Sequence, residues 1–259
     1  MAEIHSVLIT GASRGIGLEF VKQFLSNPLV RSNAVIAACR SPEKATELIK
    51  LKEGHPKLHV VKLDVTKFDE YDRVVHEVSK IVRDKGLTML INNAALGADP
   101  KHNTLNNVTA DLFISKFATN SVAPVMLAKA FLPLLQISAK VNAAKNNDSL
   151  SVTRAALINI TSRGGSITRN TGGLYWAYRE SKAALNMSTH TLALELQKEG
   201  ILVEAIHPGG VITDLTAPHN FPDLIDTATS VTAMLKVFLS LKEKNTQGII
   251  SYTGDVIPY

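Results

Sequence analysis

The sequence contains a single cysteine and no run of consecutive lysines or arginines. Cys39 alone cannot form an internal disulfide bond, and the first residues lack a basic region followed by an apolar stretch, which argues against secretion. The net charge of +5 comes from scattered basic residues without interleaved aromatic side chains, so no nucleic-acid partner is expected. The cytoplasm is therefore the predicted location.

Long uninterrupted apolar stretches are also missing. The longest apolar segment, residues 121–137, contains Lys129, Pro124 and Pro133, and it is interpreted as a buried helix and not as a membrane span. His207 precedes a proline and has no partner at metal-ligand spacing, so it is given no metal-binding role. We expect neither a membrane nor a metal ion among the partners of this chain.

The apolar residues that are present occur in short runs separated by helical patterns. At 259 residues, with 45% hydrophobic and 20% charged residues, the chain fits one globular domain over residues 1–259. Strands are predicted at residues 6–10, 34–38, 58–63, 89–91, 155–160, 202–206 and 248–252. This alternation predicts an α/β fold, a doubly wound (Rossmann) and mostly parallel sheet of about seven strands with helices on both faces.

The first predicted strand runs directly into a glycine-rich turn. Gly11, Gly15 and Gly17 follow it with the spacing Gly-x-x-x-Gly-x-Gly, and apolar residues then recur at helical spacing. Glycines allow close approach of a ligand to the backbone, and the unpaired amides of a helix N-terminus attract phosphate. A strand, turn and helix in this order predict a dinucleotide-binding site.

Tyr178 and Lys182 stand four residues apart, which places both side chains on one face of a helix. A fixed positive charge beside a phenol favours the phenolate and lowers its pKa, so Tyr178 is predicted to act as an acid or base. Tyr175 is the rival candidate, but the residue four positions beyond it is Arg179, which does not exchange protons. Tyr175 is rejected as the acid.

Polar and chemically useful residues follow the predicted strands. Arg40 follows the second strand, Asp64 and Val65 the third, residues 92–95 the fourth, Ser162 the fifth, and residues 208–213 the sixth. Since the carboxyl ends of parallel strands share one edge of the sheet, all of these residues are expected at one ligand-binding edge.

These motifs together resemble the short-chain dehydrogenase/reductase family over essentially the whole chain, and most of all its sniffer-type and C-factor-like carbonyl reductases. The closer similarity comes from residues 38–40, 177–179 and 257–259. Two departures from the family pattern are Ala95, where glycine is frequent, and a slightly longer interval between Ser162 and Tyr178. The longer interval leaves the shape of that part of the substrate cleft open.

The resemblance implies a catalytic tetrad of Asn120, Ser162, Tyr178 and Lys182. Tyr178 would donate the proton, and Ser162 would hydrogen-bond the substrate oxygen. Lys182 would hold the nicotinamide ribose, and Asn120 would anchor a water molecule. The predicted cofactor site comprises Gly11, Ser13, Arg14, Gly15, Ile16, Gly17, Arg40, Asp64, Val65, Asn93, Ala94, Tyr178, Lys182, Pro208, Gly209, Val211 and Thr213.

Arg40 decides the predicted cofactor. An NAD enzyme would place an acidic residue at the end of the second strand, whereas this chain has Cys39 and Arg40 there. Arg40, together with Arg14 in the glycine turn, could pair with the additional phosphate of NADP(H). NADP(H) is the predicted cofactor.

The predicted function is an NADPH-dependent reductase of an apolar ketone, aldehyde or quinone. Residues 214–229, with Pro218, Phe221 and Pro222, are expected to cover the cleft. Two alternatives stay open: a nucleotide-sensing interaction protein, suggested by the polar loop near Asn146, and an NAD-dependent alcohol dehydrogenase. A homodimer or other homo-oligomer is expected through residues 109–137 and 174–198, as the resemblance implies.

Overall fold

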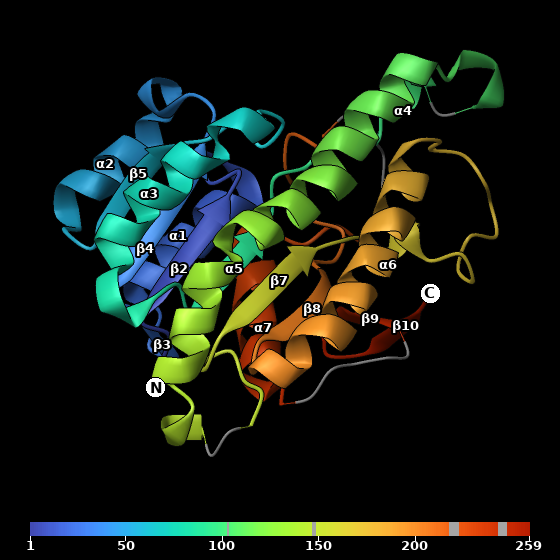
Figure 1. Ribbon diagram of the computed structural model, residues 1–259. Helices are drawn as coiled ribbons and strands as arrows, with labels where there is room; N and C mark the ends of the chain where they lie inside the picture. The colour runs from blue at the N-terminus through green and yellow to red at the C-terminus, as the bar shows by residue number, and fades with distance from the viewer. Residues whose placement is uncertain (103, 147–148, 218–222, 243–247) are drawn as a thin grey trace.

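The computed structural model describes residues 1–102, 104–146, 149–217, 223–242 and 248–259, and it has an eight-stranded sheet at its centre (Figure 1). The strands of the sheet, in spatial order, are β10 (Val256–Pro258), β9 (Gly248–Ser251), β8 (Leu202–His207), β7 (Ala156–Ile160), β6 (Met89–Asn92), β2 (Ser6–Thr10), β4 (Ala34–Cys39) and β5 (Leu58–Lys62). All neighbours are parallel except β9 and β10. The predicted doubly wound α/β fold is confirmed, and each of the seven predicted strands lies within two residues of an observed one.

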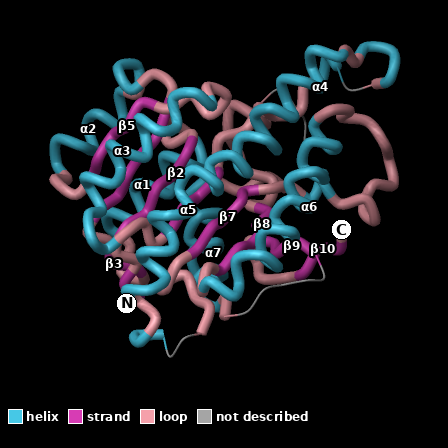
Figure 2. The backbone as a smooth tube through the Cα atoms, in the orientation of Figure 1, coloured by secondary structure: helices cyan, strands magenta, loops and turns pink. Residues whose placement is uncertain are grey.

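Helices cover both faces of the sheet (Figure 2). Their bounds are α1 Gly15–Ser26, α2 Thr46–Gly54, α3 Tyr71–Val82, α4 Ala110–Phe117, α5 Ala123–Val141, α6 Tyr178–Leu196 and α7 Thr227–Ser240. Short 3₁₀ turns occupy Pro42–Lys44, Phe68–Glu70, Arg83–Lys85, Pro100–His102, Leu105–Asn107, Ala144–Asn146, Arg163–Gly165 and Gln197–Glu199. Alternate residues of each strand point to opposite faces, so Val7 and Ile9 pack with α1 and α7, whereas Leu8 packs with α3, α5 and α6.

Three short strands were not predicted from the sequence. β10 has three residues, of which only Ile257 is buried, and it contains a proline, so neither length nor pattern marks it as a strand. β1 (Ala2–Glu3) and β3 (Val30–Arg31) have two residues each and form a separate two-stranded parallel sheet. Strands of this length carry no periodic signal.

The helical stretch Ala110–Val141 crosses the face of the sheet as the long diagonal rod of Figure 1. It is the one helix in the described ranges that is long and apolar enough to span a membrane, with a mean hydropathy of 1.6, and half of that window is buried inside the protein. Leu127, Phe131 and Leu135 of α5 are fully buried against the sheet. Core helices of globular proteins have the same composition, and the buried helix predicted at residues 121–137 lies within α5 and the turn before it.

The strand order reverses next to β2, which pairs with β4 on one side and β6 on the other. Chain connections leave β2 and β6 in opposite directions there, and this opens a crevice at the carboxyl ends of the two strands. The glycine-rich turn follows β2, and Asn93 and Ala94 follow β6. The fold therefore places two predicted site segments side by side.

Candidate active site

The glycine-rich turn links β2 to the N-terminus of α1. Gly11 and Gly15 have φ values of +66° and +55°, a conformation that residues with a side chain rarely adopt. Gly17 leaves no room for a side chain, because a Cβ there would lie 2.3 Å from the carbonyl oxygen of Gly11. Ser13, Arg14 and Ile16 complete the turn and the start of the helix.

The turn is held by the segment after β6. The Oγ1 atom of Thr10 accepts hydrogen bonds from the backbone N–H groups of Asn93 and Ala94, both at 3.0 Å. The side-chain amide of Asn93 donates to the carbonyl oxygens of Thr10 at 2.9 Å and Gly11 at 3.3 Å. The alpha carbon of Ala94 lies against Gly11, where a Cβ would come within 2.9 Å of it. Asn93 and Ala94 thus fix the shape of the turn.

Residues 208–213, which follow β8, also contact the glycine-rich turn. Thr213 contacts the turn, since a Cβ on Gly15 would lie 3.4 Å from the Cγ2 atom of Thr213. Pro208 is anchored by a 2.6 Å hydrogen bond from Ser230 to its carbonyl oxygen, and Gly209 has a φ of +90°. Val211 is buried and pairs with Ile225 in an isolated bridge. The segments after β2, β6 and β8 therefore meet at one edge, as predicted.

This edge fits a dinucleotide by its own chemistry. The first turn of α1 has no acidic residue, and Arg14 at its N-cap makes no capping hydrogen bond from its side chain. The backbone N–H groups at this helix end are therefore left for a ligand, and the positive end of the helix dipole favours a phosphate. Close backbone approach is possible because Gly11, Gly15 and Gly17 carry no side chains.

The two arginines predicted to recognise an additional phosphate have different neighbours. Arg14 pairs with Asp214 at 2.9 Å, and both side chains are largely exposed. Arg40 is exposed after β4, and its charge acts on Asp64. Burial would raise the pKa of Asp64, but hydrogen bonds from Thr66 and the charge of Arg40 outweigh it and lower that pKa. Asp64 therefore remains ionised beside Arg40.

Val65 and Asp64 follow β5 as predicted. The carboxylate of Asp64 accepts hydrogen bonds from the backbone N–H of Thr66 at 3.0 Å and from its hydroxyl at 2.8 Å. Val65 is buried, and its carbonyl oxygen accepts a 2.6 Å hydrogen bond from the phenol of Tyr71. These bonds give the segment after β5 a defined shape next to Arg40.

Lys182 lies inside the protein, one helical turn beyond Tyr178, the first residue of α6. Its side chain is 3% exposed, and its ammonium donates a 2.9 Å hydrogen bond to the carbonyl oxygen of Ile160, the last residue of β7. Burial disfavours the charged form and lowers the pKa of Lys182 to about 8. Lys182 therefore loses its proton near pH 8, well below the usual range of a lysine.

Tyr178 and Ser162 are adjacent although they lie on different elements. A Cβ on Gly164 would be 3.2 Å from the Oγ atom of Ser162 and 3.5 Å from the Cε1 atom of Tyr178, so the backbone at Gly164 borders both. The Ser162 hydroxyl also accepts a 3.0 Å hydrogen bond from the N–H of Gly164, which fixes its position. Ser162 and Tyr178 are thus brought together as predicted.

The pKa of Tyr178 was expected to be lowered, but in the structure it is raised. Burial raises this pKa, and a hydrogen bond with Ser162 and the charge of Arg179 only partly oppose the effect of burial. The predicted lowering by Lys182 was wrong for this state, because the Lys182 ammonium is directed to the carbonyl of Ile160. Tyr178 is therefore protonated at neutral pH and is suited to donate a proton.

Asn120 lies in a π-helical turn, Ala118–Val122, between α4 and α5. Its side chain accepts a 2.8 Å hydrogen bond from the N–H of Leu96 and donates to the Leu96 carbonyl and the Ser181 hydroxyl, both at 3.0 Å. Single π turns inside helices occur frequently at functional sites. Asn120 connects the loop after β6 to the helix that carries Tyr178 and Lys182.

Two residues at this site were not predicted. Ser181 is fully buried, receives the hydrogen bond from Asn120, and donates at 2.8 Å to the carbonyl oxygen of Tyr178. Gly164 borders Ser162 and Tyr178. Ser181 could have been found from its place between Tyr178 and Lys182, whereas the role of Gly164 depends on how the turn folds back.

Tyr175, the rival candidate, has a different partner from Tyr178. The guanidinium of Arg179 lies over its ring, 5.9 Å from the ring centre, and Arg179 also donates a 3.0 Å hydrogen bond to the carbonyl oxygen of Leu174. Leu174, Tyr175 and Ala177 all have positive φ values, so the backbone just before Tyr178 is strained. The strained segment sets the entry of the chain into α6.

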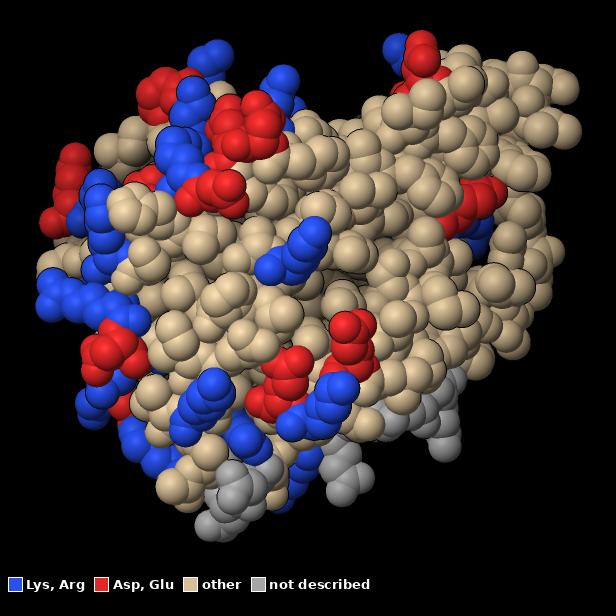
Figure 3. Space-filling model, in the orientation of Figure 1, with Lys and Arg blue, Asp and Glu red and all other residues tan. Residues whose placement is uncertain are grey.

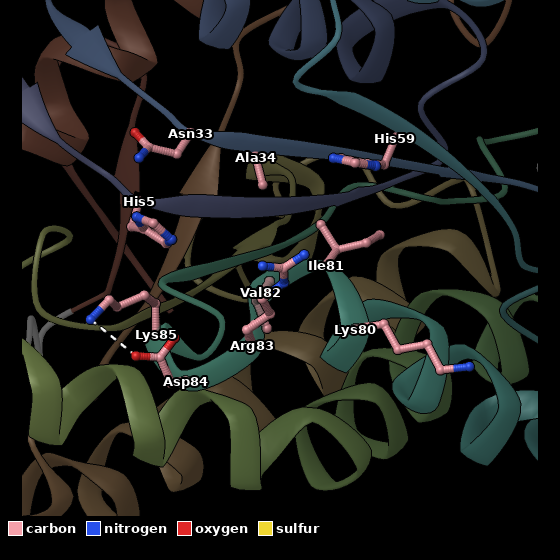
Figure 4. Close-up of a pocket in the computed structure, with 10 residues that line it drawn as sticks. All are labelled: His5, Asn33, Ala34, His59, Lys80, Ile81, Val82, Arg83, Asp84 and Lys85. Atoms are coloured by element: carbon pink, nitrogen blue, oxygen red, sulfur yellow. Dashed lines mark ion pairs between the residues drawn. The ribbon is translucent and has the colours of Figure 1, made fainter.

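A separate hollow of about 530 Å³ lies at the opposite edge of the sheet (Figure 4). Its lining includes His5 before β2, Ala34 at the start of β4, and Arg83 and Lys85 just after α3. Cations at this position balance the partial negative charge of the C-terminus of α3, and Lys85 already pairs with Asp84 at 3.1 Å. None of the predicted site residues lines this hollow, so we assign it no catalytic role.

Comparison with known proteins agrees with this geometry. A sequence profile described as short chain dehydrogenase matches residues 5–222. The carbonyl reductase Sniffer of D. melanogaster superimposes with a TM-score of 0.91 and is 37% identical, covering 99% of this chain and 100% of that one. An NADPH-bound carbonyl reductase from chicken fatty liver also superimposes with a TM-score of 0.91 and is 37% identical, covering 99% of this chain and 100% of that one. C-signal of Myxococcus xanthus is 32% identical over 171 residues, 66% of this chain and 92% of that protein.

Proposed function

Because the chain belongs to the short-chain dehydrogenase family, we propose that it is an NADPH-dependent carbonyl reductase with Tyr178 as the general acid. Family membership makes the protein an oxidoreductase, and its similarity to two carbonyl reductases supports the finer assignment. The single observation that carries the proposal is the position of Tyr178. The phenol of Tyr178 lies beside Ser162, and Tyr178 belongs to the same helix, α6, as the buried Lys182.

Each residue of the site has a part in carbonyl reduction. The bound cofactor would supply the hydride. Ser162, held by the N–H of Gly164, would donate a hydrogen bond to the carbonyl oxygen and polarise it. Tyr178 would transfer its proton to the same oxygen as negative charge develops there. Lys182, one turn along the same helix, would supply the next proton to the tyrosinate, because its pKa of about 8 lies below the raised pKa of Tyr178.

NADPH is favoured over NADH by the charges at the end of β4. Arg40 is exposed and takes part in no ion pair within the described ranges, so it is available to a phosphate. An acidic residue, which would repel that phosphate, is absent from β4 and from the position of Arg40. The similar reductase from chicken fatty liver binds NADPH, which supports this choice.

The variant Arg40→Ala is expected to lower the affinity for NADPH by about 10- to 100-fold and to leave the affinity for NADH nearly unchanged. One hydrogen bond to a charged group is worth about 1.5–3 kcal/mol, which corresponds to that range. Titration of nucleotide fluorescence gives both dissociation constants. Arg31→Ala, an exposed arginine of β3 near the opposite edge, is the matched control and should change neither. Equal affinities for NADPH and NADH in the unchanged protein would contradict the assignment.

An apolar carbonyl compound is the proposed substrate. Large apolar side chains are exposed on the two loops that follow β6 and β8 at this edge, with Leu96 at 38%, Ile212 at 59% and Leu215 at 42%. Exposed apolar side chains that border a catalytic site are covered when an apolar ligand binds. The described residues of 214–229 include Leu215, whereas Pro218, Phe221 and Pro222 lie outside the described residues.

The decisive experiment is a panel of ketones, aldehydes and quinones tested with purified protein and NADPH. Oxidation of NADPH that depends on an added carbonyl compound is the expected result. NADPH binding without oxidation of the nucleotide would favour a nucleotide sensor. Faster oxidation of alcohols with NAD would favour the dehydrogenase alternative.

The proposed assembly is a homodimer through α4, α5 and α6. The surface over these helices carries few charges, whereas charged side chains gather over α2 and α3 (Figure 3). Ile114 on α4 is 66% exposed and Met187 on α6 is 67% exposed, so two copies could bury this face between them. Sedimentation of the unchanged protein should give twice the chain mass of 28.0 kDa. The variant Met187→Glu, which places a charge in this face, should sediment with the mass of a single chain. A monomer in the unchanged protein would contradict this assembly.

A further inference from the structure

Gly97, in the loop after β6, and Leu215, in the segment after β8, meet above the carboxyl edge of the sheet. A Cβ on Gly97 would lie 2.4 Å from the Cδ2 atom of Leu215, 3.2 Å from its Cγ and 3.3 Å from its Cβ. Gly97 does not have a positive φ, so its backbone could be adopted by any residue. Glycine is needed at this position for space and not for conformation.

Hydrogen bonds from Lys116 and Asn120 hold the backbone of the loop at Gly97. The buried ammonium of Lys116, which is 4% exposed, donates a hydrogen bond to the carbonyl oxygen of Gly97. The preceding residue, Leu96, is held through both its N–H and its carbonyl by Asn120, at 2.8 Å and 3.0 Å. Because these hydrogen bonds hold the loop, a side chain added at position 97 is accommodated by a shift of the flexible, 42% exposed side chain of Leu215.

Leu215 lies in a turn tied to the cofactor side of the crevice. The hydroxyl of Thr216 donates to the carbonyl oxygen of Val211 at 2.6 Å and accepts a hydrogen bond from the N–H of Thr213 at 2.9 Å. The N–H of Ala217 donates to the carbonyl of Thr213 at 2.9 Å. Thr213 contacts Gly15 of the glycine-rich turn. Leu215 thus extends from the nucleotide side of the site.

The loop that carries Gly97 is connected to the catalytic side. Asn120 holds Leu96 and also donates to Ser181, which in turn donates to the carbonyl oxygen of Tyr178. The contact between Gly97 and Leu215 therefore connects a loop held by the catalytic side with a turn held by the nucleotide side. Leu96 and Leu215 remain partly exposed there.

We propose that the contact between Gly97 and Leu215 limits the size of the carbonyl substrate, so that Gly97 and Leu215 are specificity-determining positions. This inference rests on the proposed reductase function. Leu215 narrows the cleft because the absence of a side chain at position 97 lets it approach the loop. Shortening Leu215 widens the cleft, and adding a side chain at position 97 displaces Leu215 and loosens its turn.

The test compares Leu215→Ala, Gly97→Ala and the double variant on a small and a bulky ketone that the unchanged protein reduces. Leu215→Ala should shift the ratio of kcat/KM toward the bulky ketone by about tenfold, since a pocket contact of this size contributes that much to selectivity. Gly97→Ala should raise KM for the small ketone several-fold with kcat retained. The double variant should resemble Leu215→Ala alone, because the two nearest atoms of Leu215, Cδ2 and Cγ, are gone and only its Cβ at 3.3 Å remains.

Gly54→Ala, at the end of α2, is the matched control. A Cβ at Gly54 meets no atom within 4 Å and its φ is not positive, so the kinetics of this variant should equal those of the unchanged protein. Hydrogen exchange gives a second readout that does not depend on turnover. Gly97→Ala should increase exchange at the Thr213 and Ala217 amides, and Leu215→Ala should cancel that increase.

Two failures are distinguishable. If the unchanged protein reduces ketones but Leu215→Ala keeps the same size preference and the two substitutions act additively, the inference is overturned and the reductase function stands. If the unchanged protein reduces no carbonyl compound at all, the proposed function fails and the size limit fails with it.

Discussion

Replacing Tyr178 with phenylalanine is expected to lower kcat for carbonyl reduction by about 10²–10⁴-fold, because the variant lacks the proton donor. The ring remains and keeps its place beside Gly164, and Ser162 still accepts the N–H of Gly164 at 3.0 Å. The cofactor turn is built from other residues, so the dissociation constant for NADPH should stay within about threefold, or roughly 0.7 kcal/mol, of the original value. Stopped-flow or steady-state oxidation of NADPH measures the first effect and nucleotide fluorescence the second.

Tyr175→Phe is the control for this substitution. Tyr175 lies three positions earlier, and the guanidinium of Arg179 lies over its ring. Its variant should retain nearly full activity. Unchanged turnover in Tyr178→Phe, or a loss confined to Tyr175→Phe, would mean that the wrong phenol had been identified.

The activity of the unchanged protein in the reductive direction is expected to fall as the pH rises above about 8. The pKa of Lys182 is lowered to about 8 by burial, so its ammonium is lost from that pH upward. The pKa of Tyr178 is raised, so Tyr178 remains protonated over the same range. Once Lys182 has lost its proton, it has none to return to the tyrosinate formed by proton donation.

Two substitutions of Lys182 test whether the loss of its proton causes this decline in activity. Lys182→Met should lose most activity at every pH, whereas Lys182→Arg should retain some activity and lose the decline above pH 8, since arginine stays charged. The pH profile of kcat/KM for each variant checks this. A decline that persists unchanged in Lys182→Arg would show that another group titrates.

The same pKa shift affects stability in a defined direction. Lys182 binds its proton less tightly in the folded chain, with a pKa of about 8, than in the unfolded chain, with a pKa of 10.5. Between these values the unfolded chain binds more protons, so this residue makes the free energy of unfolding increase as the pH rises. The burial cost is fully present below pH 8, and Lys182→Met should remove this part of the pH dependence.

The sheet could be predicted from the sequence because its central strands are buried on both faces. Each residue of β2, β4 and β6 is buried, which appears in the sequence as short apolar runs ending at turns. β10 has a single buried residue and therefore left no such signal. Local pattern identifies strands that are buried on both faces, and it misses short strands at the edge.

The candidate site was predictable to the extent that its residues follow strands or share a helix. The positions of the glycine-rich turn and of Tyr178 relative to Lys182 depend only on nearby residues. The direction of the Tyr178 pKa depends on burial and on the orientation of the Lys182 ammonium, which no local pattern encodes. The contact between Gly97 and Leu215 likewise joins two loops that are distant in the chain.

The pairing of β2 with β6 has a consequence for how the protein acquires its binding site. The hydroxyl of Ser6 in β2 accepts a hydrogen bond from the N–H of Thr88, 82 residues later. The glycine-rich turn is completed only when the hydroxyl of Thr10 accepts hydrogen bonds from the N–H groups of Asn93 and Ala94. Pairing across such a separation requires closure of a long loop, which slows folding. During refolding, nucleotide binding should thus return with the docking of β6 and not with the earlier growth of individual helices.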